Sequence, residues 1–401
     1  MKITALETIL LDEFSNLLWL RVHTDEGPIG LGETFYAPAS VAKFIHEVAA
    51  PKLLGADPLR IDRISRMLAV DYTIGTAATG VETRAASAVD IALWDILGQV
   101  AGQPIHQLLG GLSRDRIRIY NTCGGYHYGR KAAGKIEEKF GLTKKAPGPY
   151  DDLNAFMNRA DELAQSLLSE GITAMKIWPF DWAAEANGGL HISAAELDKA
   201  LEPFRKIRKA VGSEIDIMVE LHSLWNLPTA KKIFAALEEF DPYWYEDPVK
   251  MTNLDAVEQL ARFTRVPICA SETLASRFVF KDLMARNAAS VIMPDLGWVG
   301  GIGEAKKIAT MAEAHHLPVA PHDCTGPVVL ISSVHLSLNA PNALIQETVR
   351  AYTSTWYRDL VTDLPKIENG YAYPMTGPGL GTRLAPGIEK RKDAVVHWSK
   401  A

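Results

Sequence analysis

Residues 215–272 read IDIMVELHSLWNLPTAKKIFAALEEFDPYWYEDPVKMTNLDAVEQLARFTRVPICASE. Three short apolar runs, at 215–220, 243–247 and 267–272, alternate with two segments, at 229–240 and 253–263, whose apolar residues recur at helical spacing. Buried strands alternating with amphipathic helices are typical of βα units and a parallel sheet. Each apolar run also ends on or next to a glutamate. The stretch therefore predicts a repeating α/β fold that carries acidic side chains at its strand ends.

The same rhythm continues on both sides of this stretch. Five further runs read as strands, at 117–121, 173–178, 290–295, 317–322 and 343–347, and residues 302–316 read as another amphipathic helix. Eight parallel strands with outer helices predict a closed (β/α) barrel. Two stretches interrupt the pattern, 126–150 and 179–190. Because both follow strand ends, we expect both to be loops on the active face of the barrel.

The segments outside the barrel have a different pattern. The first ~115 residues read as strands followed by helices. The strands are broken by turn glycines, as in IGLGETF (29–35), and by the turn Asp25-Glu26-Gly27. A buried helix runs through residues 83–102. The turn-rich segment from 370 to 384 is expected to fold back on this region. We therefore predict an α+β capping domain at 1–115, completed by 371–401, and a barrel domain at 116–370.

Composition limits the classes of partner. The net charge of -6 and pI near 6.0 argue against a nucleic-acid or anionic-membrane surface, because both need clustered cations, so a small-molecule substrate is expected. The start MKITALETILLDEF has no signal-peptide pattern, and no apolar run is long enough for a membrane span. Three distant cysteines fit reduced, buried thiols. These features predict a cytoplasmic protein.

Polar residues recur at the strand ends with a nearly constant period. Successive spacings between them are 26, 26, 23, 27 and 25 residues, which is about the length of one βα unit. Each should therefore lie at the C-terminal rim of a successive strand and face a shared pocket. The residues are Glu220, Glu246, Glu272, Asp295, His322 and Glu347.

The first three of these residues suggest a metal site. Three carboxylates in one low-dielectric pocket would repel one another and raise each other's pKa values unless a cation compensated them. Oxygen ligands favour a hard ion such as Mg²⁺. The alternative is that Glu220, Glu246 and Glu272 cap the following helices or pair with lysines and arginines.

Asp295 and His322 suggest a second constellation, one strand apart. A carboxylate beside an imidazole fixes the tautomer of the ring and raises its pKa, which gives a general base for work near neutral pH. The alternative is that His322 is an ordinary hydrogen-bonded core residue.

These residues, together with several motifs, resemble the enolase superfamily and its mandelate-racemase-like subgroup. The motifs are AASAVDIALWDILGQVAGQPIHQLLGG, YEDP, ASET, PDLGWVGGIGE and GPGLG, and the resemblance covers nearly the whole chain. It implies a modified (β/α)7β barrel with a cap, a homo-oligomer, and Mg²⁺ that stabilises an enediolate, a chemistry described in general for this superfamily. It also implies Glu220, Glu246 and Glu272 as metal ligands, Asp295 and His322 as the base dyad, and Glu347 as a hydrogen-bond partner of the enediolate.

Two positions depart from the usual pattern of the subgroup. The first metal ligand is usually Asp and here is Glu220, as in enzymes that resemble gluconate dehydratase, so the metal prediction stands. Racemases carry a Lys-x-Lys pair at the end of the second strand, whereas this chain has Lys176 and then Trp178. Lys176 is therefore either a polar wall of the site or a buried lysine paired with a ligand carboxylate.

His222 separates the reactions that remain. In enzymes that resemble galactonate and gluconate dehydratases, a histidine at this offset from the first ligand acts as the acid for the departing hydroxyl; strand alternation would turn His222 to the same side as Glu220. A hydrogen bond to a metal ligand is the alternative role.

Our main hypothesis is a Mg²⁺-dependent sugar-acid dehydratase, a hydro-lyase that gives a 2-keto-3-deoxy acid. A racemase, epimerase or cycloisomerase of a carboxylic acid is the alternative, and a catalytically silent binding or regulatory protein is a third.

The sequence does not name the sugar acid. We expect specificity to lie in the cap loops at 14–19 and 36–40 and in the insertion at 126–150. That insertion is basic, and its cations either hold a second anionic group or solvate a long loop. They are Arg130, Lys131, Lys135 and Lys139.

Overall fold

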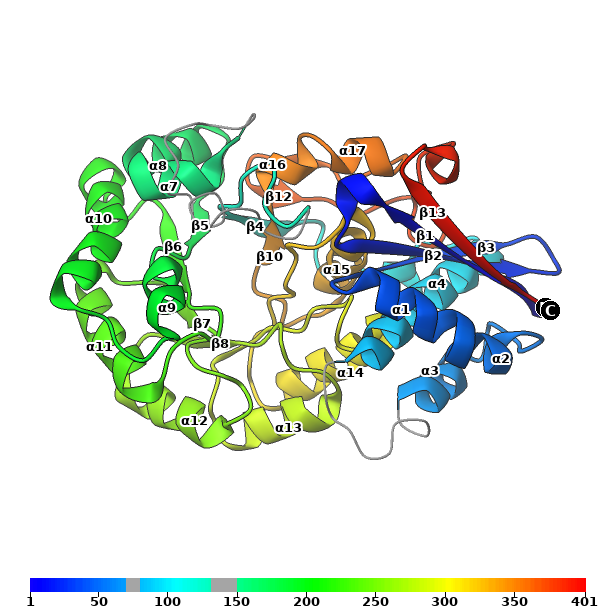
Figure 1. Cartoon of the computed structure of the whole chain (residues 1–401), viewed down its shortest axis with the longest axis horizontal. Coiled ribbons are helices and arrows are strands. Elements are labelled where there is room, and N and C mark those ends of the chain that lie inside the picture. The colour runs from blue at the N-terminus through cyan, green and yellow to red at the C-terminus, as the bar shows by residue number, and fades with distance from the viewer. Residues whose placement is uncertain (70–79, 131–149) are drawn as a thin grey trace.

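The computed structural model describes residues 1–69, 80–130 and 150–401, and within them it shows a barrel and a cap. Figure 1 shows the outer helices α8 and α10 to α14 surrounding the strands, with the blue strands of the cap and the red strand β13 together at the other end. The predicted α/β fold, a barrel with an N-terminal α+β cap joined by the C-terminal strand, is confirmed.

The barrel strands pair in parallel in the order β4 to β9, and β10 pairs with β4. The strands are β4 (Ile117–Thr122), β5 (Ala174–Ile177), β6 (Asp216–Glu220), β7 (Trp244–Glu246), β8 (Ile268–Ala270), β9 (Val291–Ile292) and β10 (Gln346–Thr348). The helices are α7 (Asp152–Asn158), α8 (Ala160–Ser169), α9 (Asp181–Asn187), α10 (Ala194–Val211), α11 (Leu227–Leu237), η3 (Glu238–Phe240), α12 (Leu254–Phe263), α13 (Arg277–Ala285), α14 (Gly301–Ala314), α15 (Pro327–Asn339), α16 (Arg350–Thr353) and α17 (Tyr357–Leu360).

The predicted strand at 317–322 is present only as single bridges. Val319 pairs with Ile292 on one side and with Ala343 on the other, which closes the ring between β9 and β10. A continuous strand does not form because Pro318 and Pro321 lack the backbone N–H that a ladder needs. The segment therefore occupies the position of a barrel strand without a strand's full hydrogen bonding.

The stretch at 179–190 is not the loop that the sequence suggested. Helix α9 occupies residues 181–187 and ends at Gly188, whose φ of 68° is left-handed. A glycine at this position of a helix end avoids the steric cost of that conformation. The helix begins directly after β5 and so brings Asp181 to the rim of the barrel.

The cap is an antiparallel sheet in the order β13-β1-β2-β3. Strand β13 comes from the C-terminus and pairs with β1 along its length, from Ala5 with Lys400 to Leu11 with Ala394. The cap elements are β1 (Ile3–Leu11), η1 (Asp12–Phe14), β2 (Leu17–Thr24), β3 (Ile29–Phe35), α1 (Pro38–Phe44), η2 (Ile45–Ala49), α2 (Ala50–Leu53), α3 (Ile61–Ala69), α4 (Val81–Ala101), α5 (Ile105–Leu108), η4 (Ile388–Lys390) and β13 (Ala394–Lys400). The hairpin of β11 (Ile367–Glu368) and β12 (Tyr371–Ala372) pairs instead with β4 of the barrel.

The sequence suggested that the glycines of IGLGETF break the strand. They do not, and instead they let helix α4 lie directly on it. A Cβ atom at Gly32 would lie 1.9 Å from the carbonyl oxygen of Ala88, and one at Gly30 would lie 2.0 Å from that of Ala92. Glycine in a strand often marks such a close backbone approach. Helix α4, which contains most of the motif AASAVDIALWDILGQVAGQPIHQLLGG, is therefore packed against the cap sheet.

Buried carboxylates join the cap to the barrel. Glu33 of β3 accepts the backbone N–H groups of Val328 and Val329 at the start of α15, and Asp90 of α4 accepts that of Gly303 in α14. Negative groups are stabilised at helix N-termini, where backbone N–H groups are unpaired. Since α15 follows the segment that carries His322, the contact of Glu33 fixes the cap over the active end of the barrel.

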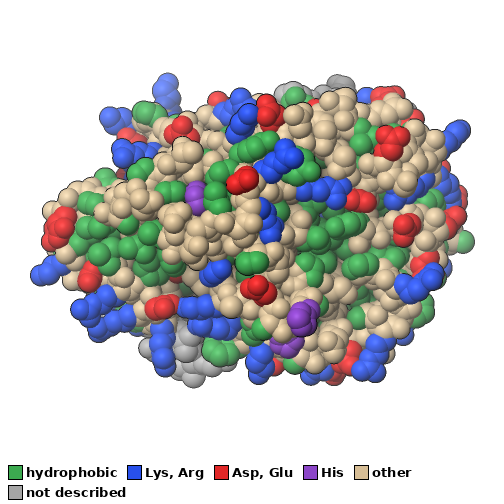
Figure 2. Space-filling view, turned by 180° about the vertical axis from the view of Figure 1, so that it is seen from behind, with side chains coloured by type: hydrophobic (Ala, Val, Ile, Leu, Met, Phe, Trp, Pro, Cys, Tyr) green, Lys and Arg blue, Asp and Glu red, His purple; other side chains and the backbone are tan. Residues whose placement is uncertain are grey.

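One residue from each barrel position, and two from the position of β9, fill the interior below the site, as in a packed barrel core. These side chains are Tyr120, Ala174, Met218, Trp244, Cys269, Val291, Met293, Ala320 and Ile345. The cysteines Cys123, Cys269 and Cys324 are free, as predicted. On the face shown in Figure 2, acidic and basic side chains are interspersed rather than gathered into one patch. No helix in the described parts of the chain is both long and apolar enough to cross a bilayer.

Candidate active site

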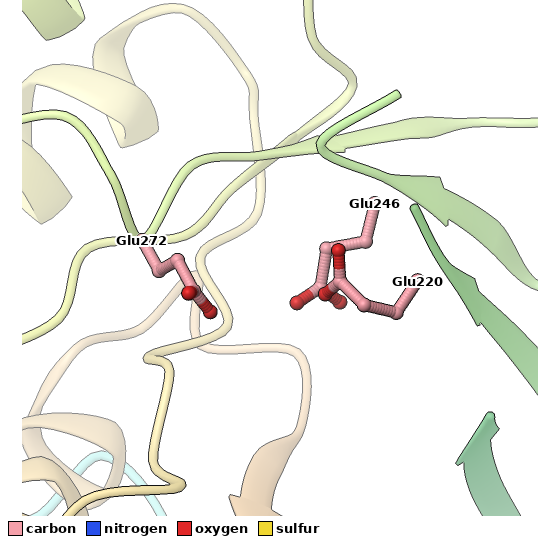
Figure 3. Close-up of side chains that lie close together, drawn as sticks. All are labelled: Glu220, Glu246 and Glu272. Carbon is pink, nitrogen blue, oxygen red and sulfur yellow. The ribbon is translucent and has the colours of Figure 1, made fainter. Parts of the chain in front are cut away.

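Three glutamates converge at the C-terminal ends of neighbouring strands. Glu220 ends β6, Glu246 ends β7, and Glu272 lies two residues beyond β8. Each offers a carboxylate oxygen, and the three oxygens lie within 4.8 Å of one another. Figure 3 shows Glu220 and Glu246 side by side, with Glu272 pointing toward them from the other side. Parallel pairing of Glu220 with Glu246 brings the first two together, as the strand-end spacing predicted.

Lys176 lies inside the barrel below these carboxylates. Its Nζ is 2.5 Å from Glu246 Oε1, 2.9 Å from Glu347 Oε1 and 3.5 Å from Glu220 Oε2, and only 2% of the residue is exposed. These contacts are those of a buried lysine paired with carboxylates rather than of a pocket wall. The sequence left this pairing open as one of two roles, because it did not show which strand-end carboxylates come within reach of β5.

The residues present fit a divalent cation. Lys176 and the two site imidazoles supply at most three positive charges, whereas six carboxylates lie among them: Asp181, Glu220, Glu246, Glu272, Asp295 and Glu347. Burial and the neighbouring charge of Glu220 raise the pKa of Glu246 well above its usual value. An all-oxygen donor set of this kind is typical of sites for hard cations. The triad is therefore consistent with a divalent metal site.

His322 is held between two carboxylates. Its Nδ1 lies 2.6 Å from Asp295 Oδ2, and its Nε2 lies 2.7 Å from Glu272 Oε2. Burial by itself would lower the pKa of the ring, but the charges of Glu272 and Glu347 and the hydrogen bond to Asp295 raise it well above the usual value. This surrounding makes the imidazole a stronger base than an isolated histidine. Asp295 and His322 are also bridged in register.

Glu347 lies beside the same ring. Its Oε2 is 3.9 Å from His322 Nε2 and accepts the backbone N–H of Asp323 at 2.8 Å, while Thr122 donates its hydroxyl to Oε1. The side chain is fully buried. It is thus fixed on strand β10 within reach of both Lys176 and His322.

A second carboxylate–imidazole pair, which the sequence did not reveal, faces the site from β6. His222 Nδ1 lies 2.6 Å from Oδ2 of Asp181, the first residue of α9. Burial would lower the pKa of His222, but the charges of Asp181 and Glu220 raise it to about 9. Strand alternation does not aim the ring, because His222 and Ser223 lie beyond β6 with φ values of 47° and 58°. The one sequence signal for Asp181 is an acidic residue shortly after a predicted strand.

The two histidines stand on opposite sides of the barrel. Between β6, which leads to His222, and the segment that carries His322 lie β7, β8 and β9 in one direction and β5, β4 and β10 in the other. The carboxylate triad occupies the arc from β6 to β8 between them. A small molecule held at this rim would therefore meet one imidazole from each side.

Aromatic side chains frame the mouth of the site. Trp298 stacks against Tyr36 of the cap and lies 5.5 Å from the ring of His322, while Trp178 lies 5.7 Å from the ring of His222 and 5.2 Å from that of Tyr128. Tyr36 has a φ of 65°, in the left-handed region. Each of the two histidines therefore has a tryptophan beside it, and Tyr36, from the predicted cap loop at 36–40, stacks on one of these tryptophans.

The other predicted specificity segments are only partly described. The stretch at 14–19 is a loop only at residues 15 and 16, because Phe14 ends η1 and Leu17 begins β2. Phe14 is buried against Trp356. Arg130 is buried as well, paired with Glu13 at 2.5 Å and lying over the ring of Phe14. Its charge is therefore matched by a carboxylate of this chain, and it does not solvate an exposed loop. Lys131, Lys135 and Lys139 lie outside the described residues.

Comparison with known proteins gives the same family from both domains. Residues 159–388 match the enolase C-terminal domain-like family, and residues 9–110 match the mandelate racemase / muconate lactonizing enzyme N-terminal domain. A D-galactonate dehydratase from Pectobacterium atrosepticum is 32% identical over 408 aligned residues, covering 100% of this chain and 95% of that protein. A D-xylonate dehydratase from Haloferax volcanii is 29% identical, covering 96% of this chain and 87% of that protein.

A solved structure extends the similarity to the whole fold. An enolase of the mandelate racemase subgroup from Agrobacterium tumefaciens is 52% identical to this chain, with a TM-score of 0.89, and the match covers 100% of this chain and 99% of that one. Small carboxylates are the typical substrates of such enzymes. With the family match spanning the barrel and the cap, and with the carboxylate triad in place, this chain belongs to the enolase superfamily, in its mandelate racemase and muconate lactonizing enzyme subgroup.

Proposed function

We propose that this enzyme is a Mg²⁺-dependent dehydratase of a sugar acid, of the aldonate type. The substrate loses the proton at C2 and the hydroxyl at C3, and the product is a 2-keto-3-deoxy acid. The dehydratase names of relatives at about 30% identity support this class of reaction, although they do not identify the sugar.

The observation that carries the proposal is the pair of imidazoles on opposite strands. Elimination of water from a carbon acid needs a base at C2 and an acid at the C3 hydroxyl. His322 with Asp295, and His222 with Asp181, provide two such groups, each held by a carboxylate at 2.6 Å. Because they approach from opposite walls, one can take a proton while the other gives one.

The cation would be held by Glu220, Glu246 and Glu272, whose oxygens lie within 4.8 Å of one another. When bound, Mg²⁺ supplies electrophilic stabilisation of the substrate carboxylate as negative charge develops on it. The remaining work falls to side chains of this chain. Glu347, as the carboxylic acid, donates a hydrogen bond to the enediolate, and the aromatic side chains near the two histidines exclude water from it.

The reaction consists of two proton transfers. His322 removes the C2 proton through Nε2, while Asp295 holds Nδ1 and stabilises the imidazolium that forms. His222 then gives its Nε2 proton to the C3 hydroxyl as the C3–O bond breaks and water leaves. The resulting enol takes up a proton at C3 and becomes the 2-keto acid.

A screen of sugar acids tests the proposal directly. The purified enzyme is incubated with MgCl2 and each member of a panel of aldonates and aldarates in D2O, and the products are followed by NMR. A 2-keto-3-deoxy product with deuterium at C3 is expected for at least one acid. The absence of elimination across the panel would overturn the proposal.

Two variants separate the roles of the histidines. His322→Asn should abolish both turnover and solvent exchange at C2, because it removes the base. His222→Asn should reduce elimination to a small residual rate while exchange at C2 continues. Retained exchange in the first variant, or full dehydration in the second, contradicts the corresponding role.

An isomerase or epimerase on the same scaffold is the second candidate. The position of His222 opposite His322 favours it, since inversion at C2 needs a proton donor on each side of the planar enediolate. The same NMR screen distinguishes the two reactions. An altered stereocentre without loss of mass means isomerisation, whereas a 2-keto product means elimination.

A further inference from the structure

Asp181 and His222 come from neighbouring barrel units and form a closed pair at the rim. Asp181 begins α9, directly after β5, and His222 follows β6, which pairs with β5. The side chain of Asp181 is 6% exposed, whereas that of His222 is 28% exposed. The carboxylate is therefore buried behind a ring that still reaches the pocket.

Two contacts restrict this ring, and a third fixes the backbone of the same residue. Asp181 Oδ2 lies 2.6 Å from Nδ1, and the indole of Trp178 meets the ring edge-on, at 5.7 Å between centroids and 77° between planes. The backbone N–H of His222 donates to Glu220 Oε1 at 2.6 Å, which ties the residue to the metal triad. The left-handed φ values of His222 and Ser223 are rare for residues with side chains, and such conformations persist where the surroundings impose them.

The arrangement repeats the contact made by the base on the opposite side. In both pairs an aspartate oxygen lies 2.6 Å from Nδ1 of the imidazole. A carboxylate on Nδ1 leaves Nε2 as the nitrogen that can exchange a proton with a substrate. The two pairs differ in the element that carries the aspartate. Asp295 follows β9, which is next to the segment that carries His322, whereas Asp181 begins helix α9.

We propose that Asp181 is a positioning residue that makes His222 the acid of this site. The inference rests on the proposed dehydration. By binding Nδ1, Asp181 directs Nε2–H of the imidazolium to the C3 hydroxyl; that proton goes to the oxygen, the C3–O bond breaks, and water leaves. The neutral ring that remains keeps Nδ1–H on Asp181 and regains its Nε2 proton from solvent.

The test is the variant Asp181→Asn, assayed with MgCl2 and the acid that the wild type dehydrates fastest. Loss of the positioning carboxylate should lower kcat for elimination by about 100-fold, with KM and the rate of C2 exchange in D2O changed by less than about 3-fold. A structural role would lower both rates together. Asp152→Asn, which removes a buried carboxylate paired with Arg350, is the matched control and should leave the ratio of exchange to elimination unchanged.

The double variant Asp181→Asn/His222→Asn gives a comparison of elimination rates that does not depend on a change in stability. If Asp181 acts through His222, its removal costs nothing further once His222 is gone, whereas independent effects multiply. Elimination by Asp181→Asn within about 3-fold of the wild type, or a full additional loss in the double variant, overturns the inference.

A spectroscopic test of the contact between Asp181 and His222 does not require turnover. In ¹⁵N-histidine-labelled enzyme, the Nδ1–H signal that disappears in His222→Asn should also be lost in Asp181→Asn and be kept in Asp152→Asn. An unchanged signal in Asp181→Asn overturns the inference. Failure of the wild type to dehydrate any acid in the panel defeats the proposed function instead, and the signal then decides whether Asp181 holds the ring.

Discussion

Two histidines buried between the cap and the barrel should make the fold sensitive to acid. His106 of α5 and His335 of α15 stack with their Nδ1 atoms 3.1 Å apart. The backbone N–H of His106 donates to Nδ1 of His335, and Nε2 of His335 lies 3.2 Å from the carbonyl oxygen of Leu380. These contacts fit a neutral His335, with Nδ1 accepting and Nε2–H donating. A proton on Nδ1 would set two donors against each other.

The size of the effect follows from the pKa. Burial lowers the pKa of His335 from 6.5 to about 3. Above pH 6.5 the ring is neutral in both the folded and the unfolded chain, so it adds no pH dependence. As the pH falls from 6.5 toward 3, the unfolded chain takes up a proton that the folded chain does not, and stability is lost. At pH 5 the loss is about 2 kcal/mol, or roughly 2 to 3 °C in Tm for a chain of this length.

The assay compares the wild type with His335→Gln by calorimetry at about pH 7.5 and pH 5. Glutamine does not titrate in this range and keeps one donor and one acceptor. The wild type should lose roughly 2 to 3 °C more than the variant between the two pH values. The difference between the proteins cancels the opposite contribution of buried carboxylates such as Glu33, whose pKa is raised by burial to about 8. His315→Gln, at an exposed site, is the control and should behave as the wild type does. Equal losses in the wild type and His335→Gln would refute the reasoning.

Three further predictions concern the metal site and the cap. Glu246→Gln should weaken Mg²⁺ binding about 100-fold by calorimetric titration, because it removes one of three carboxylates. The control Glu239→Gln, at an exposed position, should have no effect. Equal Mg²⁺ affinities of the two variants would contradict the proposed site. Lys176→Met should lower Tm by roughly 4 to 6 °C, since breaking a buried ion pair costs about 3–5 kcal/mol, and saturating Mg²⁺ should restore part of that loss in a thermal melt. An unchanged Tm would show that the lysine does not balance these charges. Gly32→Ala should cost about 1–3 kcal/mol in a denaturant titration, because its Cβ would lie 1.9 Å from the carbonyl oxygen of Ala88; a neutral substitution would mean that α4 can move away from β3.

The barrel and its carboxylate triad could be predicted because both depend on periodicity. A βα unit has a nearly constant length, so the spacing of Glu220, Glu246 and Glu272 places them on consecutive strands whatever the details of the helices. The sequence-based predictions of secondary structure were wrong where individual prolines or glycines oppose the periodic pattern of apolar residues. Pro318 and Pro321 remove N–H donors from an otherwise strand-like run. The glycines at 30 and 32 read as turn residues because close packing of a helix on a strand leaves no local signal.

Asp295 and His322 were predicted as a pair because both stand at strand ends, whereas the contact of Asp181 with His222 and the choice between the two roles of Lys176 could not be settled from the spacing. Asp181 looked like part of a loop, and its contact with His222 depends on a helix start, on left-handed backbone at 222 and 223, and on the adjacency of β5 and β6. Lys176 reaches Glu246 and Glu347 only because the sheet closes into a ring.

The amino-acid sequence by itself determined which chemical groups stand at the end of each barrel unit and how many residues separate them, because strand and helix periods are local properties of the chain. Closure of the barrel decided which of those groups meet. That step sets distances of a few ångströms between side chains up to 225 residues apart, from Thr122 to Glu347, and such distances depend on the curvature of the whole sheet rather than on any stretch of sequence.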